Sequence, residues 1–145
     1  MQRRYETTTP AETEALGGEL ASRLVPGDVV LIEGELGAGK TTFVRGACRS
    51  LGIAAPITSP TFTIGQRYPG AVAVSHLDLF RISDLGSEDP ELLADYLGQH
   101  TIGFVEWAGG AHRDLAAFAR VAARVQIEHA GGDRRIVEVE CDPRV

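Results

Sequence analysis

The chain has 145 residues, of which 43% are hydrophobic and 23% charged, as expected of one soluble globular domain. No apolar stretch approaches the roughly 20 residues of a transmembrane helix, and Cys48 and Cys141 alone form neither a disulfide framework nor a metal cluster. The formal net charge of -6 argues against a protein that grips nucleic acid by itself, because such proteins present a basic face to the phosphates. We therefore expect a cytoplasmic protein without a membrane anchor.

A short strand and a helix are the first predicted elements. Residues 3–7 favour an edge strand. The following Thr9-Pro10-Ala11-Glu12 is typical of a helix start: Thr9 caps the helix, Pro10 takes its first position and Glu12 closes a capping box. The helix is predicted to run to about Leu24, with a leucine at every fourth position of one apolar stripe.

A phosphate-binding motif follows the next strand. Residues 29–32 are a short apolar run, and Gly34-Glu35-Leu36-Gly37-Ala38-Gly39-Lys40-Thr41-Thr42 then satisfies the pattern G-x-x-x-x-G-K-[ST]. Helical spacing continues to Leu51 and stops at Gly52, so the motif has the strand and helix that it requires. Lys40 is also the only lysine in the chain. It stands at the one place where the broad, planar guanidinium of arginine could not replace the compact ammonium of lysine.

The motif predicts a bound magnesium nucleotide. Backbone N–H groups from Gly37 to Thr42 would surround the β-phosphate, at which the positive end of the helix also points. Lys40 would reach the β and γ oxygens, and the Thr41 hydroxyl can ligate Mg²⁺. The predicted nucleotide contacts of this loop are Glu35, Leu36, Gly37, Ala38, Gly39, Lys40, Thr41 and Thr42.

The remaining elements predict an α/β fold. Residues 57–64 and 71–77 would pair as a hairpin around a Pro-Gly turn, a helix would run from Asp89 to a stop at Gly98, and residues 101–105 would form another strand. The last two runs, 121–129 and 135–141, alternate around a Gly-Gly-Asp turn. We predict a three-layer, P-loop NTPase-like single domain. Its mostly parallel sheet would carry a C-terminal antiparallel hairpin and bind ligands at the carboxyl ends of its strands.

Two acids follow apolar runs where a magnesium nucleotide site needs a carboxylate: Asp78 and Glu106. Trp107, the only tryptophan, would flank the nucleotide or belong to the core. Thr61 lies in a Ser-Pro-Thr segment where nucleotide switches keep a threonine that senses the γ-phosphate, although a surface turn has the same composition. The four histidines lie on separate segments without ligand spacing, so we expect no metal cluster among them.

Four motifs occur in order: the phosphate loop, Ser-Pro-Thr-Phe-Thr at 59–63, His-Leu-Asp-Leu-Phe-Arg at 76–81 and Val-Glu-Trp at 105–107. Together they resemble the TsaE family, the bacterial ATPases of tRNA threonylcarbamoyladenosine synthesis, over about residues 9–107. The resemblance implies an ATPase that is slow alone and works with TsaB and TsaD, whose complex it resets between modification cycles. It would meet tRNA only through that complex.

The resemblance also implies roles for individual residues. Lys40 and Thr41 would hold phosphate and magnesium, Glu106 would serve magnesium, and Asp78 would be the acid needed for activity. Phe80 stands where the family commonly has tyrosine, so only the packing role of that ring carries over. The remaining implied positions are the switch threonine Thr61, Trp107 near the nucleotide, and nucleotide contacts near Thr13, Gly132 and Arg134.

Two other functions stay open. A small-molecule kinase would share the loop and the magnesium chemistry, but such kinases usually add a mobile lid with several arginines, for which only Arg81, Arg113 and Arg120 are available. A nucleotide-dependent interaction module would differ only in its rate and its dependence on partners. A GTPase is less favoured because the chain has no Asn-Lys-x-Asp.

Overall fold

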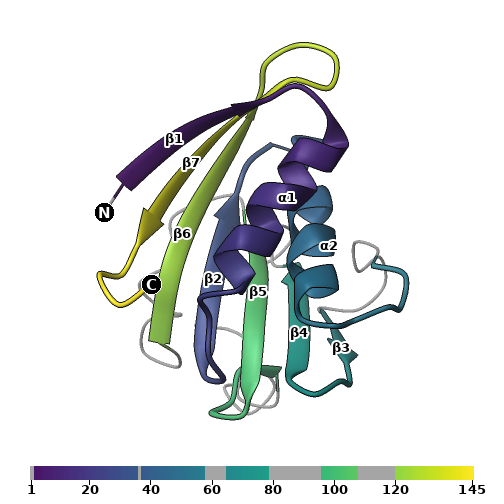
Figure 1. The fold of residues 1–145 in the computed structure, drawn as a ribbon, viewed down its shortest axis with the longest axis vertical. Helices are drawn as coiled ribbons and strands as arrows, with labels where there is room; N and C mark the ends of the chain where they lie inside the picture. The colour runs from purple at the N-terminus through teal and green to yellow at the C-terminus, as the bar shows by residue number, and fades with distance from the viewer. Residues whose placement is uncertain (1, 36, 58–64, 79–95, 108–119) are drawn as a thin grey trace, which may run out of the picture.

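The computed structural model describes residues 2–35, 37–57, 65–78, 96–107 and 120–145. These residues form one sheet and two helices (Figure 1). In chain order the elements are β1 (Gln2–Thr7), α1 (Pro10–Ala21), β2 (Asp28–Glu33), α2 (Lys40–Ser50), β3 (Gly65–Tyr68), β4 (Ala73–Asp78), β5 (Thr101–Trp107), β6 (Arg120–His129) and β7 (Arg135–Cys141).

The sheet has seven strands in the order β1-β7-β6-β2-β5-β4-β3. Its centre is parallel, because β2 pairs in parallel with β5 and β6, and β4 pairs in parallel with β5. Both ends are antiparallel, through the pairs β1 with β7, β6 with β7 and β3 with β4. The sheet is therefore mixed, and the prediction of a mostly parallel sheet was wrong: short turns join β3 to β4 and β6 to β7 as hairpins, and the N-terminal β1 adds a further antiparallel pair with β7.

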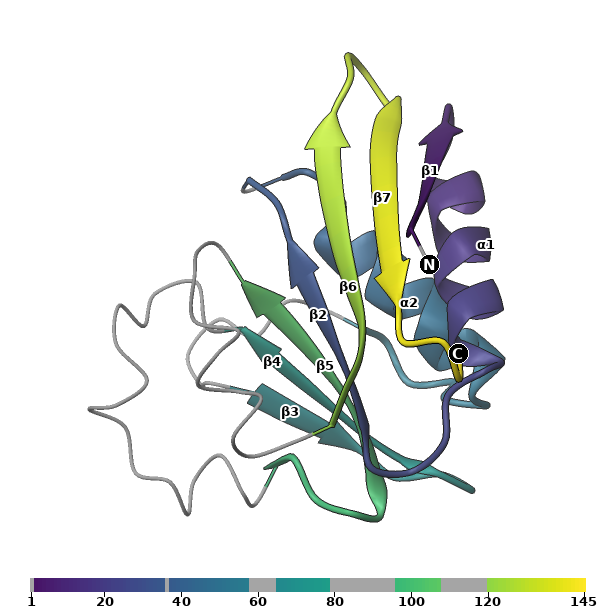
Figure 2. The ribbon, with the colours of Figure 1, turned by 90° about the vertical axis from the view of Figure 1, so that its left-hand side faces the viewer.

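Both described helices lie on one face of the sheet (Figure 2). The apolar residues Phe43 and Val44 of α2 pack with Val30, Ile32 and Phe104 in the main core. On the opposite face, Val29, Leu31 and Val105 are also buried, and Leu97 packs against Gly103. The helix predicted from Asp89 lies almost wholly outside the described residues, so a helical layer on this second face stays a prediction.

The start of α1 follows its sequence signals. The Thr9 side chain accepts a hydrogen bond from the Glu12 N–H at 3.2 Å and caps the helix, as predicted. The Glu12 carboxylate, however, accepts the Thr8 hydroxyl at 2.5 Å instead of closing the predicted capping box. The helix ends at Ala21 rather than near Leu24, because the Leu24 N–H already bonds to the nearer Ala21 carbonyl. Leu24 is nevertheless buried.

The described residues contain a hairpin at the place of the one predicted for residues 57–64 and 71–77. Its second strand is β4, but its first strand is β3, which begins at Gly65, directly after the predicted run. Gly65 pairs with Leu77 and Tyr68 with Val74, so the Pro69-Gly70 turn lies where it was expected. Residues 58–64 lie outside the described part of the chain.

The two helices approach closely at a pair of glycines. A Cβ on Gly17 of α1 would stand 2.1 Å from the Phe43 carbonyl oxygen of α2, and one on Gly46 would stand 1.9 Å from the Glu14 carbonyl oxygen of α1. Real Cβ atoms do not approach backbone so closely, so the helices could not keep this separation with any other residue at either position. This contact fixes α2, and hence the loop before it, against α1.

We expect Gly46→Ala to destabilise the protein by about 1–3 kcal/mol or more, the usual cost of overpacking, because the added methyl meets backbone that cannot move aside. The matched control is Gly18→Ala on the same helix pair, where the Cβ would make an ordinary 3.4 Å contact with the Gly46 oxygen. Urea unfolding of both variants measures the two costs. Equal stability of the variants would contradict the close approach.

Cys48 and Cys141 are both free. Cys48 is fully buried in α2, and burial raises the pKa of its thiol to about 11, against the opposing charge of Arg49. It is therefore a protonated apolar core residue at neutral pH rather than a nucleophile. Within the described residues, no helix is long and apolar enough to cross a membrane.

Candidate functional site

The loop between β2 and α2 depends on glycine at three positions. A Cβ on Gly34 would stand 2.6 Å from the Ile127 carbonyl oxygen of β6, so only glycine lets the chain leave β2 there. Gly37 and Gly39 have φ angles of 79° and 105°, in the left-handed region that other residues avoid. Gly39 is the N-cap of α2, and as a glycine it has no side chain with which to cap that helix. N–H groups in the first turn of an α-helix have no partner within the helix and are suited to binding an anion.

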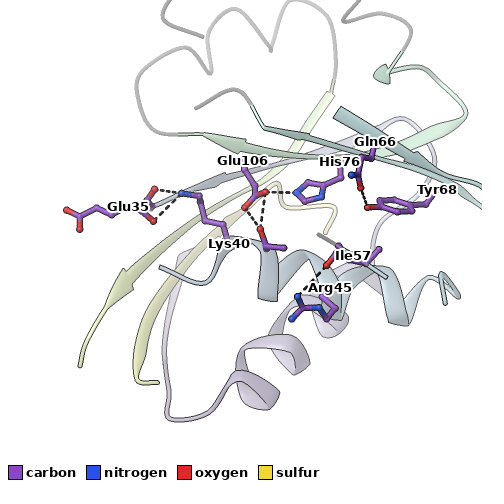
Figure 3. A network of polar contacts seen from close by, with 10 residues as sticks. Glu35, Lys40, Arg45, Ile57, Gln66, Tyr68, His76 and Glu106 are labelled. Carbon is purple, nitrogen blue, oxygen red and sulfur yellow. Dashed lines mark hydrogen bonds and ion pairs between the residues drawn. The ribbon is translucent and has the colours of Figure 1, made fainter. Parts of the chain in front are cut away.

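Lys40 begins α2 and folds back over the loop. Its side chain is buried, and Nζ donates to the Gly34 carbonyl at 2.5 Å and to the Glu35 carbonyl at 3.2 Å. The carboxylate of Glu35 points away from it (Figure 3). Burial lowers the pKa of Lys40, while the negative charges of Glu106 and Asp78 act to raise it. The ammonium therefore bonds to the loop carbonyls and interacts electrostatically with both acids.

Glu106 is the centre of a buried polar chain. The Thr41 hydroxyl donates to its Oε1 at 3.0 Å and to its Oε2 at 3.3 Å, and Nε2 of His76 lies 2.6 Å from the same Oε2 (Figure 3). Glu106 is only 2% exposed and His76 is 0% exposed. A buried carboxylate is costly unless it is hydrogen-bonded, so these two partners fix its position beside the first turn of α2.

The two predicted acids lie on neighbouring strands. Asp78 ends β4 and is the register partner of Glu106 in β5, which is in turn the partner of Ile32 in β2. The carboxyl ends of three parallel strands therefore meet beside the phosphate loop, where the strand order predicted chemistry. Asp78 is half-buried, and its charge acts on Lys40.

Two residues of this region were missed by the sequence analysis. His76 was set aside with the other histidines, although the period-two pattern of a strand places it on the same face as Asp78. Arg135 of β7 donates from Nε to the Ala38 carbonyl at 2.7 Å and from Nη1 to the Gly132 carbonyl at 2.7 Å. No local pattern indicates this contact, because Arg135 and Ala38 are 97 residues apart.

The other predicted contacts are brought together only in part. Thr13 is buried in α1, with its hydroxyl 2.8 Å from that of Thr7, and no described contact joins it to the loop. Gly132 and Arg134 are exposed in the turn between β6 and β7, and their carbonyls reach the loop through Arg135. Thr42 is half-buried in the first turn of α2. Leu36, Thr61 and the side chain of Trp107 lie outside the described residues.

The site offers oxygen ligands that suit magnesium. The Thr41 hydroxyl and the Glu106 carboxylate are adjacent, and both are hard donors. Within the described ranges, no group of three or more His, Cys, Asp or Glu residues is arranged to hold a metal. Two protein ligands fit a phosphate-loop site, in which phosphate oxygens and water complete the octahedron.

Comparison with known proteins agrees with these features. Residues 7–137 match the family model described as threonylcarbamoyl adenosine biosynthesis protein TsaE. The chain is 39% identical to the tRNA threonylcarbamoyladenosine biosynthesis protein TsaE of Bacillus subtilis, covering 92% of this chain and 82% of that protein. It is 37% identical to the Streptomyces coelicolor protein of the same name, covering 81% and 80%. The crystal structure of Bacillus subtilis YdiB superposes with a TM-score of 0.71 at 34% identity, covering 99% of this chain and 88% of that one.

Proposed function

This chain belongs to the TsaE family, whose members take part in tRNA threonylcarbamoyladenosine biosynthesis, and we propose that it serves that pathway as a P-loop ATPase that hydrolyses ATP to ADP and phosphate. The observation that carries the proposal is the contact of Thr41 with Glu106 in the first turn of a helix whose N-cap is a glycine. A phosphate-binding loop and a strand-end carboxylate are the two halves of a magnesium nucleotide site.

Each described part of the site has a task in this proposal. The N–H groups at the start of α2 bind the phosphates, and Lys40 exchanges its loop carbonyls for phosphate oxygens. Bound magnesium, held by Thr41 and Glu106, would neutralise charge that develops on the phosphates. His76 keeps Glu106 in place, and Asp78 orients the attacking water from the neighbouring strand. The proposal includes the P-loop NTPase-like fold with helices on both faces of the sheet.

The proposed partners are TsaB and TsaD, and the proposed compartment is the cytoplasm. A net charge of -6 gives the chain little attraction for nucleic acid, so tRNA would be met only through those subunits. ATP turnover would be slow until they are present.

One contact argues against the alternative function as a small-molecule kinase. Arg120, one of three arginines available for a lid, donates from Nε to Oδ1 of the buried Asp28 at 2.8 Å. That contact lies at the start of β2, the end of the strand away from the phosphate loop. Arg81 and Arg113 lie outside the described residues.

Hydrolysis of γ-labelled ATP by the protein alone, and with TsaB, TsaD and tRNA, tests the proposal. We expect the label in inorganic phosphate, at a rate that rises when the partners are added, and weaker competition from GTP than from unlabelled ATP. Label on a small molecule would instead indicate a kinase, and equal competition by GTP would contradict the preference for adenine. Tight binding of tRNA to the isolated protein at physiological salt would contradict the indirect role of tRNA.

A further inference from the structure

Arg135 joins the phosphate loop to the C-terminal hairpin. On the loop side, its guanidinium donates to the carbonyls of Ala38 at 2.7 Å and Gly37 at 3.4 Å. On the hairpin side, Nη1 donates to the carbonyls of Gly132 at 2.7 Å and Arg134 at 2.8 Å. One side chain therefore satisfies four backbone acceptors from two segments distant in the sequence.

The loop needs such a partner for a geometric reason. When its N–H groups turn toward a bound phosphate, neighbouring carbonyls are left facing outward, and each needs a donor. Ala38 is buried, so water is a poor substitute at its carbonyl. Glycines at positions 37 and 39 leave the loop backbone more conformations than other residues would, and the hydrogen bonds from Arg135 of β7 can restrict that freedom.

We propose that Arg135 is a positioning residue for the phosphate loop, holding it in its binding conformation and tying it to the turn formed by residues 131–134. This inference rests on the proposed function, because it assigns Arg135 to the nucleotide site of that function. Arg135 acts through the loop backbone: its described hydrogen bonds all end on backbone carbonyls. The loop and the turn consequently behave as one unit.

Two substitutions distinguish the effect of the bridging guanidinium donors of Arg135 from the effect of its positive charge. Arg135→Met keeps the aliphatic stem and removes every donor, whereas Arg135→Lys keeps the charge but places it at one point that cannot bridge both segments. Arg124→Ala is the control, because Arg124 is exposed on the neighbouring strand β6. ADP with magnesium is the probe, measured by calorimetry, and amide hydrogen exchange reports on the loop and the turn without nucleotide.

We expect Arg135→Met and Arg135→Lys each to weaken ADP binding by on the order of tenfold, the loss of charged hydrogen bonds. Exchange should rise together in the loop and in the turn, and stay unchanged in β4 and β5. Arg124→Ala should match the parent protein. If Arg135→Met fails to unfold cooperatively, Arg135→Lys carries the comparison.

The proposal is overturned if the Arg135→Lys variant retains the parental affinity for ADP, since charge alone would then suffice. It is also overturned if amide hydrogen exchange in the loop changes independently of exchange in the turn. Failure of the parent protein to bind ADP would instead reject the proposed function. The exchange measurement would still decide whether Arg135 couples the two segments.

Discussion

Lys40→Ala is expected to abolish productive ATP binding in a protein that still folds. The substitution removes the ammonium that bonds to the loop carbonyls and interacts electrostatically with the acids at the strand ends. In the proposed function Lys40 would make charge-assisted contacts with two phosphates, and their loss should weaken ATP binding by at least about 100-fold at roughly 1.5–3 kcal/mol each. Folding should survive, because the charge of Lys40 is itself costly to bury.

Titration calorimetry with ATP and magnesium measures the effect, and thermal unfolding confirms that the variant is folded. Arg49→Ala is the matched control, since Arg49 lies in the last turn of the same helix and bonds to the Ile53 and Ala55 carbonyls. It should leave ATP affinity unchanged. A folded Lys40→Ala protein with the parental affinity would refute the phosphate-loop assignment.

The second prediction with a large effect distinguishes the roles of Asp78 and Glu106. Asp78→Asn should keep magnesium-dependent ATP binding but lose turnover by roughly 10²–10⁴-fold, because an amide of the same shape can neither accept a proton nor orient water with charge. Glu106→Gln should instead raise the magnesium concentration needed for binding by at least about tenfold. The basis for this difference is that Glu106, and not Asp78, accepts the Thr41 hydroxyl.

Binding and hydrolysis across a magnesium series distinguish these outcomes. Glu33→Gln is the control: Glu33 also ends a central strand, but it bonds to Gln126 at 3.4 Å. That substitution should change neither quantity. If Asp78→Asn shifts the magnesium requirement and Glu106→Gln does not, the assignments are reversed.

Local sequence signals determined much of the architecture. The apolar run, the glycine spacing and the helical pattern after Lys40 each concern a few consecutive residues, so β2, the loop and α2 lie close to their predicted bounds. The alternation of apolar and polar residues also predicted β6 and β7, because one face of each strand is buried. Asp78 and Glu106 were predicted at strand ends because each follows an apolar run, and the parallel register then made them neighbours.

Only the tertiary structure decided how distant segments complete the site. The role of His76 depends on Glu106, 30 residues away, and that of Arg135 on a loop 97 residues away. Gly17 and Gly46 look like weak helix positions until the two helices are brought into contact. In each case the deciding contact joins residues that are distant in the sequence and forms only on folding. The phosphate loop was thus determined by its own residues, and the side chains that hold it and its carboxylate in place by the fold.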